Sequence, residues 1–248
     1  MLRIETLDGD AVAANWSRVE GPLVDAYVTI FNRDWNESWS PQSAGHRLVS
    51  SLRHTEHRHP VVTLAWDGES VAAFALGSIV RGDDGVDERD LPAYYPLRPG
   101  QLGEARRALV PTSDAPYVLG SGWAVRPEYR DLQTLGESVV GFFARCRELG
   151  CDSVRGWTSR RSRGFFLYLA AGSKVLYDFD DDARLCLFSA PIGRIMRLSK
   201  LRRLAGLGRS ILRAYIFVVI TVRGLLAEQR SVRRGFLGLS ASTSQVGG

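Results

Sequence analysis

The chain has 248 residues, of which 45% are hydrophobic and 24% are charged. These values are typical of a globular protein with a buried core, so they exclude a disordered chain, a fibrous repeat and a small disulfide-stabilised protein. The formal net charge is +5, but residues 191–248 hold eleven basic residues and one acidic residue. We therefore expect a mildly acidic body, residues 1–190, with a basic C-terminal extension.

The cysteines and the hydropathy pattern point to a reducing compartment. Cys146, Cys151 and Cys186 are odd in number, and their spacing matches no metal site. The first ten residues lack a basic leader and an apolar run, and the longest uncharged apolar block of the extension, 214–222, is shorter than the roughly 20 residues of a membrane-spanning helix. The interpretation is a cytoplasmic protein without a metal site.

The first part of the chain predicts an edge strand and two helices. Residues 2–7 are typical of a short strand, and the apolar spacing over 22–32 predicts a helix. Ser40 before Pro41 is typical of a helix start, with serine as the N-cap. The expected apolar face of this second helix comprises Leu48, Val49 and Leu52.

The middle of the chain predicts a hairpin followed by a long irregular segment. Two β-rich runs, 61–66 and 70–80, flank a turn at Gly68. Residues 81–115 then gather Gly, Pro and Asp, with a short helix expected near 103–109. A connection of this length usually has a function, so we interpret it as a substrate-facing loop.

The remaining segments alternate between strand and helix patterns. They comprise a strand at 116–125, a helix at 132–149, a strand at 153–158, a helix at 161–171 that ends at Gly172, and a hairpin of 173–179 with 184–189. This order predicts one mixed α/β (α+β) domain over residues 1–190. A basic amphipathic and apolar helical extension is expected over 191–230, and a disordered end over 231–248.

Four stretches of this domain carry a resemblance to a known family. They read FNRDWNESWSP at 31–41, VAAFALG at 71–77, AVRPEYR at 124–130 and LYLAAG at 167–172. In this order they resemble the loop after the first helix, the third strand, the end of the fourth strand and the fourth helix of the GNAT family of acyl-CoA-dependent N-acyltransferases. The resemblance covers roughly residues 20–190 and implies a GNAT-like fold.

The resemblance implies where acetyl-CoA or another acyl-CoA would bind. In the family the fourth and fifth strands splay apart, the pantetheine arm binds like an added strand, and the next helix holds the pyrophosphate at its N-terminus. Here that helix would begin near 131–133. The implied binding residues are Val125, Arg126, Arg130, Gln133, Thr134, Leu135 and Gly136. The family loop carries two small residues, Gly then Gly or Ala, where this chain has Gln133 and Leu135.

The resemblance also implies catalytic roles. Tyr168 matches the tyrosine that protonates the leaving thiolate, and the backbone N–H of Val125 is the implied partner of the thioester carbonyl. No acid occurs in the strand at 117–123. The base is therefore Glu37, or a water chain that Ser121 orients, or none if the amine arrives neutral. We expect Trp35, Trp39 and Trp123 either in the acceptor site or in the core.

The function implied is transfer of an acyl group, most simply acetyl, from coenzyme A to a primary amine of a small molecule or peptide. The missing loop glycines and the missing strand acid leave an alternative: a GNAT-like binding or scaffold protein without turnover, recruited to a membrane surface or a protein partner by its basic extension.

Two further patterns invite a metal interpretation. His54, His57 and His59 fall within six residues, but no nearby acid or cysteine completes a known ligand spacing, so we interpret them as a solvated helix terminus. Asp178 and 180–182 form an acidic turn without the pattern of a calcium loop.

The basic extension has four alternative uses. It packs on the body or on a second copy in a homodimer, lies on an anionic membrane, meets an acidic carrier protein, or binds nucleic acid. The apolar block at 214–222 favours docking or dimerisation, with the membrane second. No aromatic-interleaved surface for nucleic acid is visible, so that partner is not expected.

Overall fold

The computed structural model describes residues 2–35, 37–82, 84–92, 95, 97–130, 132–162, 165, 168–169, 171–179, 184–199 and 222. Its strands are β1 (Arg3–Asp8), β2 (Arg58–Asp67), β3 (Ser70–Val80), β4 (Tyr117–Val125), β5 (Ser153–Ser159), β6 (Lys174–Asp178) and β7 (Leu185–Pro191). Its helices are α1 (Asp10–Ala14), α2 (Trp16–Asp34), α3 (Pro41–Ser51), α4 (Gln101–Leu109), α5 (Leu132–Glu148) and α7 (Ile192–Ser199), with short 3₁₀ turns at Glu88–Asp90 and Pro127–Tyr129.

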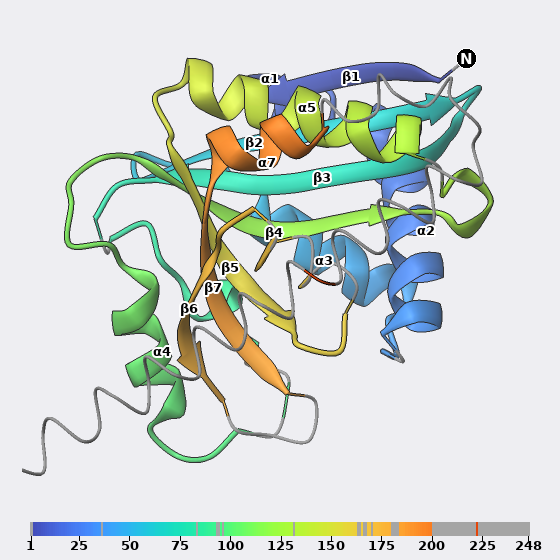
Figure 1. Cartoon of the computed structure of the whole chain (residues 1–248). Helices are drawn as coiled ribbons and strands as arrows, with labels where there is room; N and C mark the ends of the chain where they lie inside the picture. Colours follow the sequence, from blue (N-terminus) through green and yellow to red (C-terminus); the bar gives the residue numbers. More distant parts are fainter. Residues whose placement is uncertain are drawn as a thin grey trace, which may run out of the picture.

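The strands form a single mixed sheet in the order β1-β2-β3-β4-β5-β7-β6. Every neighbouring pair is antiparallel except β4 and β5, which are parallel. Figure 1 shows that β1 to β4 run side by side across the molecule, whereas β5, β7 and β6 turn away from them. The prediction of a mixed α/β domain is therefore confirmed. The pairing is parallel only between β4 and β5, where the sheet also bends.

Local sequence signals determine the N-terminal hairpin and the start of α3. Strands β2 and β3 pair along their full length around Gly68, whose φ of 58° suits glycine. The Ser40 side chain accepts a hydrogen bond from the backbone N–H of Ser43, and the Ser43 side chain completes a capping box. The predicted apolar face of α3 included Val49, and this prediction is wrong, because the residue is 47% exposed.

Helix α2 is longer than the sequence pattern predicts. It begins at Trp16 and continues through Pro22 to Asp34, whereas the prediction began at Pro22. The extra turns are stabilised by packing, because Val19 is only 1% exposed. This packing outweighs the backbone hydrogen bond that proline cannot make.

The C-terminal half follows the predicted order. Strands β6 and β7 form the closing hairpin. Of the helix predicted at 161–171, the structure describes Phe165, Tyr168 and Leu169 as helical, and Gly172 follows with a φ of 79°. The extension begins as α7, which buries Ile192 and Ile195 beside α5 (Figure 1).

The rest of the extension, apart from Val222, lies outside the described residues, so the predicted domain limits, the disordered end and the roles given to the extension remain predictions. Among the described residues, no helix combines the length and the apolar run that crossing a membrane requires.

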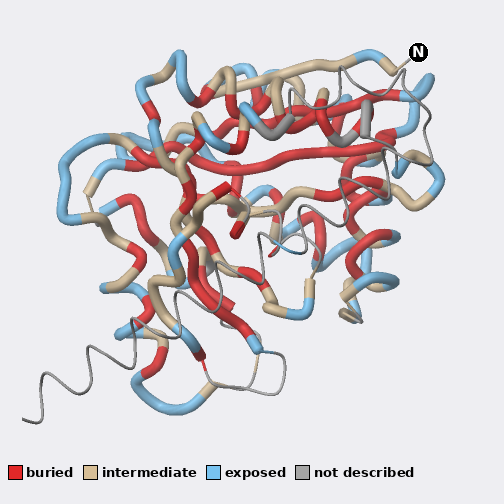
Figure 2. Tube along the Cα trace, in the orientation of Figure 1, coloured by how far each residue is buried: buried red, intermediate tan, exposed pale blue. Residues whose placement is uncertain are grey.

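Helices cover both faces of the sheet. Helices α1, α2 and α3 share one apolar cluster with one face, while α5 and α7 share another with the opposite face. Figure 2 shows β2 and β3 buried along almost their whole length between these layers. Helix α5 lies close to the sheet at Gly141, where an added Cβ would lie 3.1 Å from the side chain of Thr63.

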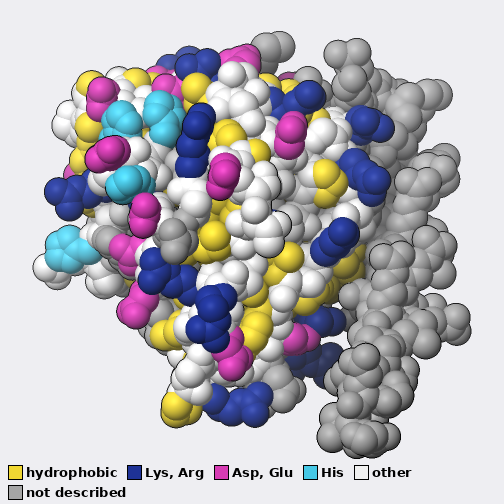
Figure 3. Space-filling view, turned by 90° about the vertical axis from the view of Figure 1, so that its left-hand side faces the viewer, with side chains coloured by type: hydrophobic (Ala, Val, Ile, Leu, Met, Phe, Trp, Pro, Cys, Tyr) yellow, Lys and Arg dark blue, Asp and Glu magenta, His cyan; other side chains and the backbone are white. Residues whose placement is uncertain are grey.

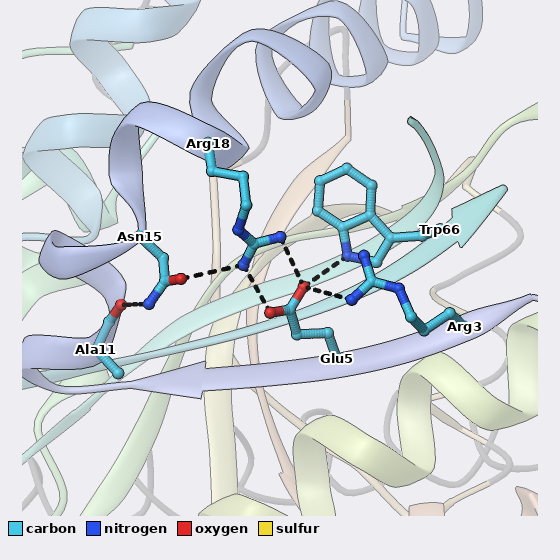
Figure 4. Close-up of polar contacts among 6 residues, drawn as sticks. All are labelled: Arg3, Glu5, Ala11, Asn15, Arg18 and Trp66. Carbon is cyan, nitrogen blue, oxygen red and sulfur yellow. Dashed lines mark hydrogen bonds and ion pairs between the residues drawn. The ribbon is translucent and has the colours of Figure 1, made fainter. Parts of the chain in front are cut away.

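Glu5 links the first strand to helix α2 and to β2 (Figure 4). Its carboxylate accepts two hydrogen bonds from the Arg18 guanidinium, at 2.6 and 3.1 Å, and one of 2.9 Å from the indole N–H of Trp66. Arg3 adds an ion pair at 3.6 Å. Hydrogen bonding by Arg18 lowers the pKa of Glu5, although partial burial opposes the shift.

We predict that Glu5→Gln lowers the free energy of unfolding by about 1 kcal/mol at pH 7. Because the folded-state pKa of Glu5 is lowered, its contribution is complete above the unfolded-state pKa and is lost as the pH falls through the folded value. Urea unfolding of both proteins at several pH values should therefore give a difference that shrinks as the pH drops below about 4. A difference that stays constant over this range would contradict the assignment.

Candidate functional site

Strands β4 and β5 pair for only two residues and then diverge. The described pairs are Val118 with Val154 and Leu119 with Arg155. Strand β5 nevertheless keeps its pairing with β7 over all seven of its residues. A β-bulge in β4 accompanies the divergence, because Gly77 pairs with Gly120 and Leu76 with Gly122, which leaves Ser121 as the extra residue. Among the described residues, no strand therefore pairs with β4 on the side of β5 beyond Gly120.

Two glycines stand where the strands separate. A Cβ added to Gly156 would lie 3.3 Å from the carbonyl oxygen of Gly120, which is tighter than ordinary packing. A Cβ added to Gly122 would lie 3.6 Å from the Phe74 ring and 3.8 Å from the Phe31 ring. The backbones of β4 and β5 thus lie close together at Gly156, whereas a side chain at Gly122 would make only ordinary contacts.

The open edge of β4 presents backbone N–H groups. The N–H of Arg126 donates to the carbonyl of Ala72 at 2.9 Å, so this residue faces β3. Successive residues of a strand point their N–H groups to opposite sides, so the N–H groups of Trp123 and Val125 face away from β3 toward the divergence. The carbonyl of Val125 points the same way, because it accepts a hydrogen bond of 3.1 Å from the Arg130 side chain.

Tyr168 lies beside this open edge on the face covered by α5. Its ring stacks on Phe188 at 4.1 Å between centroids and meets the Trp123 ring edge-on at 6.4 Å. Burial raises the pKa of the Tyr168 phenol above its ordinary value, so the hydroxyl stays protonated at neutral pH. Its role as a proton donor in catalysis remains a prediction.

Trp123 carries an unsatisfied donor in the same place. Its indole nitrogen is buried and has no hydrogen-bond partner among the described residues. A buried donor without a partner costs about 1–3 kcal/mol, so native proteins usually reserve such groups for water or a ligand. The Trp123 N–H therefore marks a position where a ligand acceptor atom would be stabilised.

The two arginines expected at the phosphates contact helix α2. Arg126 pairs with Asp25 and donates to the carbonyl of Val71 at 2.8 Å. Arg130 pairs with Asp34. These contacts fasten the end of β4 to α2, and a role for either arginine at a phosphate remains a prediction.

Helix α5 begins at Leu132, within the range that the sequence predicts. Of the residues expected in the phosphate loop, Thr134 is 3% exposed and Gly136 is buried. Asp131 lies outside the described residues, as do the side chains of Gln133 and Leu135.

Glu37 lies on the opposite face, the face covered by α2. Its carboxylate accepts a hydrogen bond from the indole N–H of Trp39 and another, at 3.2 Å, from the hydroxyl of Tyr95. The Asn32 side chain holds the loop by donating to the Trp39 carbonyl at 2.8 Å and accepting from its N–H at 2.7 Å. Glu37 is thus held in place by aromatic side chains from two segments.

Two aromatic residues that sequence reasoning missed join this group. Trp157 of β5 has its ring 6.2 Å from Trp35 at 89° and 5.9 Å from Tyr95 at 76°. Trp123, grouped with Trp35 and Trp39 in the sequence prediction, belongs to the cluster on the other face. Buried and partly exposed residues alternate along β5, and this pattern could have placed Trp157 on a partly exposed face. Tyr95 lies in a segment without periodicity, so the sequence held no comparable signal for it.

A buried ion pair holds the long connection near the site. Arg58 makes two hydrogen bonds to Asp90, at 2.7 and 2.9 Å, and donates to the Gly85 carbonyl at 2.9 Å. The two side chains are 12% and 5% exposed. This contact fixes the segment that carries Tyr95, and a substrate-facing role for this segment remains a prediction.

His54 and His59 contact neighbouring side chains, and the cysteines are buried. His54 contacts Asp10 at 2.7 Å and packs edge-on against His59. Figure 3 shows histidine side chains close to acidic side chains at the upper left of the view. Among the described residues no group of three or more potential ligands is arranged to hold a metal. All three cysteines are buried, and burial raises the pKa of Cys151 to about 12, so its thiol stays protonated at neutral pH.

Comparison with known proteins identifies the fold. No family profile matches the sequence, and no curated protein matches it. Among solved structures, the CoA-dependent acyl-homoserine lactone synthase BjaI superposes with a TM-score of 0.54 at 14% identity, covering 82% of this chain and 89% of that one. The fold is GNAT-like.

Two acetyltransferases superpose on this GNAT-like fold less closely. An acetyltransferase of the GNAT family from Staphylococcus aureus gives a TM-score of 0.43 at 11% identity, with 77% of this chain and 99% of that chain covered. The ribosomal-protein-S18-alanine N-acetyltransferase from Escherichia coli gives 0.40 at 12% identity, with coverages of 77% and 94%.

We predict that Asp90→Asn destabilises the protein by about 3 kcal/mol, because it leaves the buried Arg58 guanidinium without its counter-charge. Urea unfolding measures the loss. Asp84→Asn, an exposed change in the same segment, serves as the matched control and should change the stability by less than about 0.5 kcal/mol. Equal effects of the two substitutions would show that the ion pair does not hold this segment.

Proposed function

We propose that the protein is an acyl-CoA-dependent N-acyltransferase that moves an acyl group, most simply acetyl, to a primary amine of a small molecule or peptide. The observation that carries this proposal is the open edge of β4. It presents the backbone N–H groups of Trp123 and Val125 beside the unsatisfied indole N–H of Trp123 and the protonated hydroxyl of Tyr168.

The open edge is suited to an extended ligand with amide groups. A pantetheine arm contains two amides and would pair with β4 as an added strand does. The start of α5 would then face the diphosphate, with Arg126, Arg130 and residues 133–136 as the proposed binding set. Because Gln133 and Leu135 replace small residues, the phosphate contacts of this chain would rely more on side chains and on the helix terminus than on a glycine loop.

The acyl thioester supplies an activated carbonyl, and the protein residues supply the remaining chemistry. The N–H of Val125 stabilises negative charge on the carbonyl oxygen. Glu37 accepts the proton that the amine nitrogen loses as the new C–N bond forms, and Ser121 is the alternative position for orienting a water that does so. Tyr168 donates its proton to the sulfur as the C–S bond breaks. The products are an amide and the free thiol of coenzyme A.

The solved neighbours support the donor class. One structure of BjaI contains S-adenosylmethionine and isopentyl-CoA, and it superposes on this chain with a TM-score of 0.52 at 14% identity. We therefore propose testing donors from acetyl-CoA to isopentyl-CoA. For acceptors we propose primary amines, with S-adenosylmethionine among them.

Isothermal titration with acetyl-CoA and isopentyl-CoA tests donor binding. Titration of the Trp123→Phe variant tests whether the indole N–H contributes to that binding. This change removes the unsatisfied N–H and keeps a ring, so the stability should change by less than about 1 kcal/mol while the affinity for the bound thioester falls about tenfold. Trp66→Phe is the matched control: its indole N–H already bonds Glu5, so it should lower stability and leave the affinity unchanged. If neither thioester binds the unmodified chain, the proposed function is wrong.

Tyr168→Phe tests catalysis separately from binding. Removing the hydroxyl should reduce kcat at least 100-fold and leave thioester affinity within about twofold, because only the proton donor is lost. Because burial raises the pKa of Tyr168, its ionisation should not reduce the rate of the unmodified protein between pH 7 and about 9.5. Thioester binding without turnover of any amine by the unmodified protein would instead support the scaffold alternative.

A further inference from the structure

An ion pair joins the residues that follow β4 to the end of helix α2. The Arg130 guanidinium pairs with the carboxylate of Asp34, the last residue of α2, and its Nε–H donates to the Val125 carbonyl at 3.1 Å. The paired residues lie 96 positions apart in the chain. Figure 1 shows the tip of β4 next to α2. One side chain therefore links two elements that are distant in sequence.

Both members of this pair are partly exposed. The Arg130 side chain is 43% exposed and the Asp34 side chain 24%. Water and dissolved ions compete for the charges of such a pair, so it contributes little net stability. A phosphate oxygen binds a guanidinium in the same geometry as a carboxylate does, often through two parallel hydrogen bonds. The Asp34 carboxylate is therefore a partner that a more highly charged anion can replace.

The neighbouring arginine is held more firmly. Arg126 pairs with Asp25 of the same helix, but its side chain is only 14% exposed and also donates to the Val71 carbonyl at 2.8 Å. Moving this guanidinium would break a backbone hydrogen bond in a mostly buried position, which is costly. Of the two arginines, Arg130 is therefore the one that can change partners more easily.

Arg130 is also close to the start of helix α5. Leu132, the first residue of α5, follows it by two positions, and two residues of chain span at most about 7 Å. The long aliphatic stem of arginine has several rotatable bonds, so its charged end can turn from α2 toward this helix start. The first turn of a helix attracts anions. A diphosphate held there would compete with Asp34 for Arg130.

We propose that Asp34 holds Arg130 in the unliganded protein, and that the diphosphate of the acyl donor takes the place of this carboxylate. Donor binding then releases the end of α2 and the connection from α2 to α3, which follows Asp34 directly. The proposal rests on the proposed function only for the identity of the anion as part of coenzyme A. The exchange of partners itself is testable with inorganic diphosphate.

Thermodynamic linkage determines the sign of the effect. If a bound diphosphate takes Arg130 from Asp34, the ion pair opposes diphosphate binding, and removing the carboxylate must raise the affinity. By the same linkage, bound diphosphate must loosen the end of α2. An ion pair that only braces the fold would produce neither effect.

Titration calorimetry of the full chain with inorganic diphosphate tests the exchange directly. We expect Asp34→Asn to bind diphosphate about three- to fivefold more tightly than the unmodified chain, the range that the loss of a partly exposed ion pair allows. Arg130→Gln should weaken binding at least threefold. Unchanged or weaker binding by Asp34→Asn would overturn the proposal, as would the failure of the unmodified chain to bind diphosphate.

A double-mutant cycle separates the exchange from a general effect of charge. In the Arg130→Gln background, Asp34→Asn should change the affinity by less than about 1.5-fold, because no ion pair is left to break. Asp25→Asn is the matched control, since it removes the same charge from the same helix, and it should raise the affinity less than Asp34→Asn. Equal increases in both backgrounds, or with both aspartates, would overturn the exchange. Urea unfolding verifies that each variant folds.

Hydrogen exchange at the end of α2 provides a readout that is independent of affinity. The N–H of Trp35 donates to the Phe31 carbonyl at 3.0 Å, so it reports on the last turn of α2. Diphosphate should speed its exchange, and Asp34→Asn should exchange fast without ligand. The N–H of Ala44, which donates to the Ser40 carbonyl in α3, should keep its rate. Unchanged or slower exchange at Trp35 on adding diphosphate would contradict the release.

Titration of the same proteins with acetyl-CoA and isopentyl-CoA separates the two proposals. If diphosphate shows the exchange and neither thioester binds, the proposed function is contradicted and the exchange stands. If a thioester binds the unmodified chain and Asp34→Asn does not raise its affinity, the exchange alone is contradicted.

Discussion

The candidate site depends on the short pairing between β4 and β5. Two residue pairs hold these strands together, and then β4 stays with β3 while β5 stays with β7. Among the described residues, each strand therefore has one edge paired along its length and one edge where only two pairs form. The bulge at Ser121 and the close approach of Gly156 to Gly120 lie where the strands separate, so local backbone geometry produces the opening. An open edge inside a sheet is an unusual arrangement, because unpaired backbone groups are costly unless water or a ligand satisfies them.

The opening has different surroundings on its two sides. On the α5 side, Trp123 and Tyr168 offer hydrogen-bond donors in a buried, apolar environment, where a donor interacts strongly with a ligand oxygen or sulfur. On the α2 side, Trp35 and Trp157 meet edge-on, and the carboxylate of Glu37 accepts a hydrogen bond from Trp39. The ion pairs of Arg126 and Arg130 with α2, and of Arg58 with Asp90, hold the elements around this point.

Much of the fold was predictable from sequence because its signals are local. The β2–β3 hairpin follows from alternating residues around a glycine turn, and α3 begins where serine and proline form a capping box. Predictions failed where burial decided the outcome. Helix α2 extends through Pro22 because its apolar residues pack on the sheet, and Val49 faces solvent although its neighbour Leu48 is buried. A periodic pattern indicates that a helix has an apolar face but does not define the edges of that face.

The sequence by itself determined the order of the elements, because periodicity and turn residues are local signals, and four short motifs resembled the GNAT family, whose fold the structure shares. Tertiary structure decided which side chains meet. Trp157 meets Trp35 across more than one hundred residues of chain, and Tyr95 meets Glu37 across 58. Trp123 lies apart from them on the other face. Arg126 and Arg130 pair with carboxylates of α2 that lie about one hundred residues earlier. Such contacts depend on how strands are ordered in the sheet, and the chain's local preferences do not specify that order.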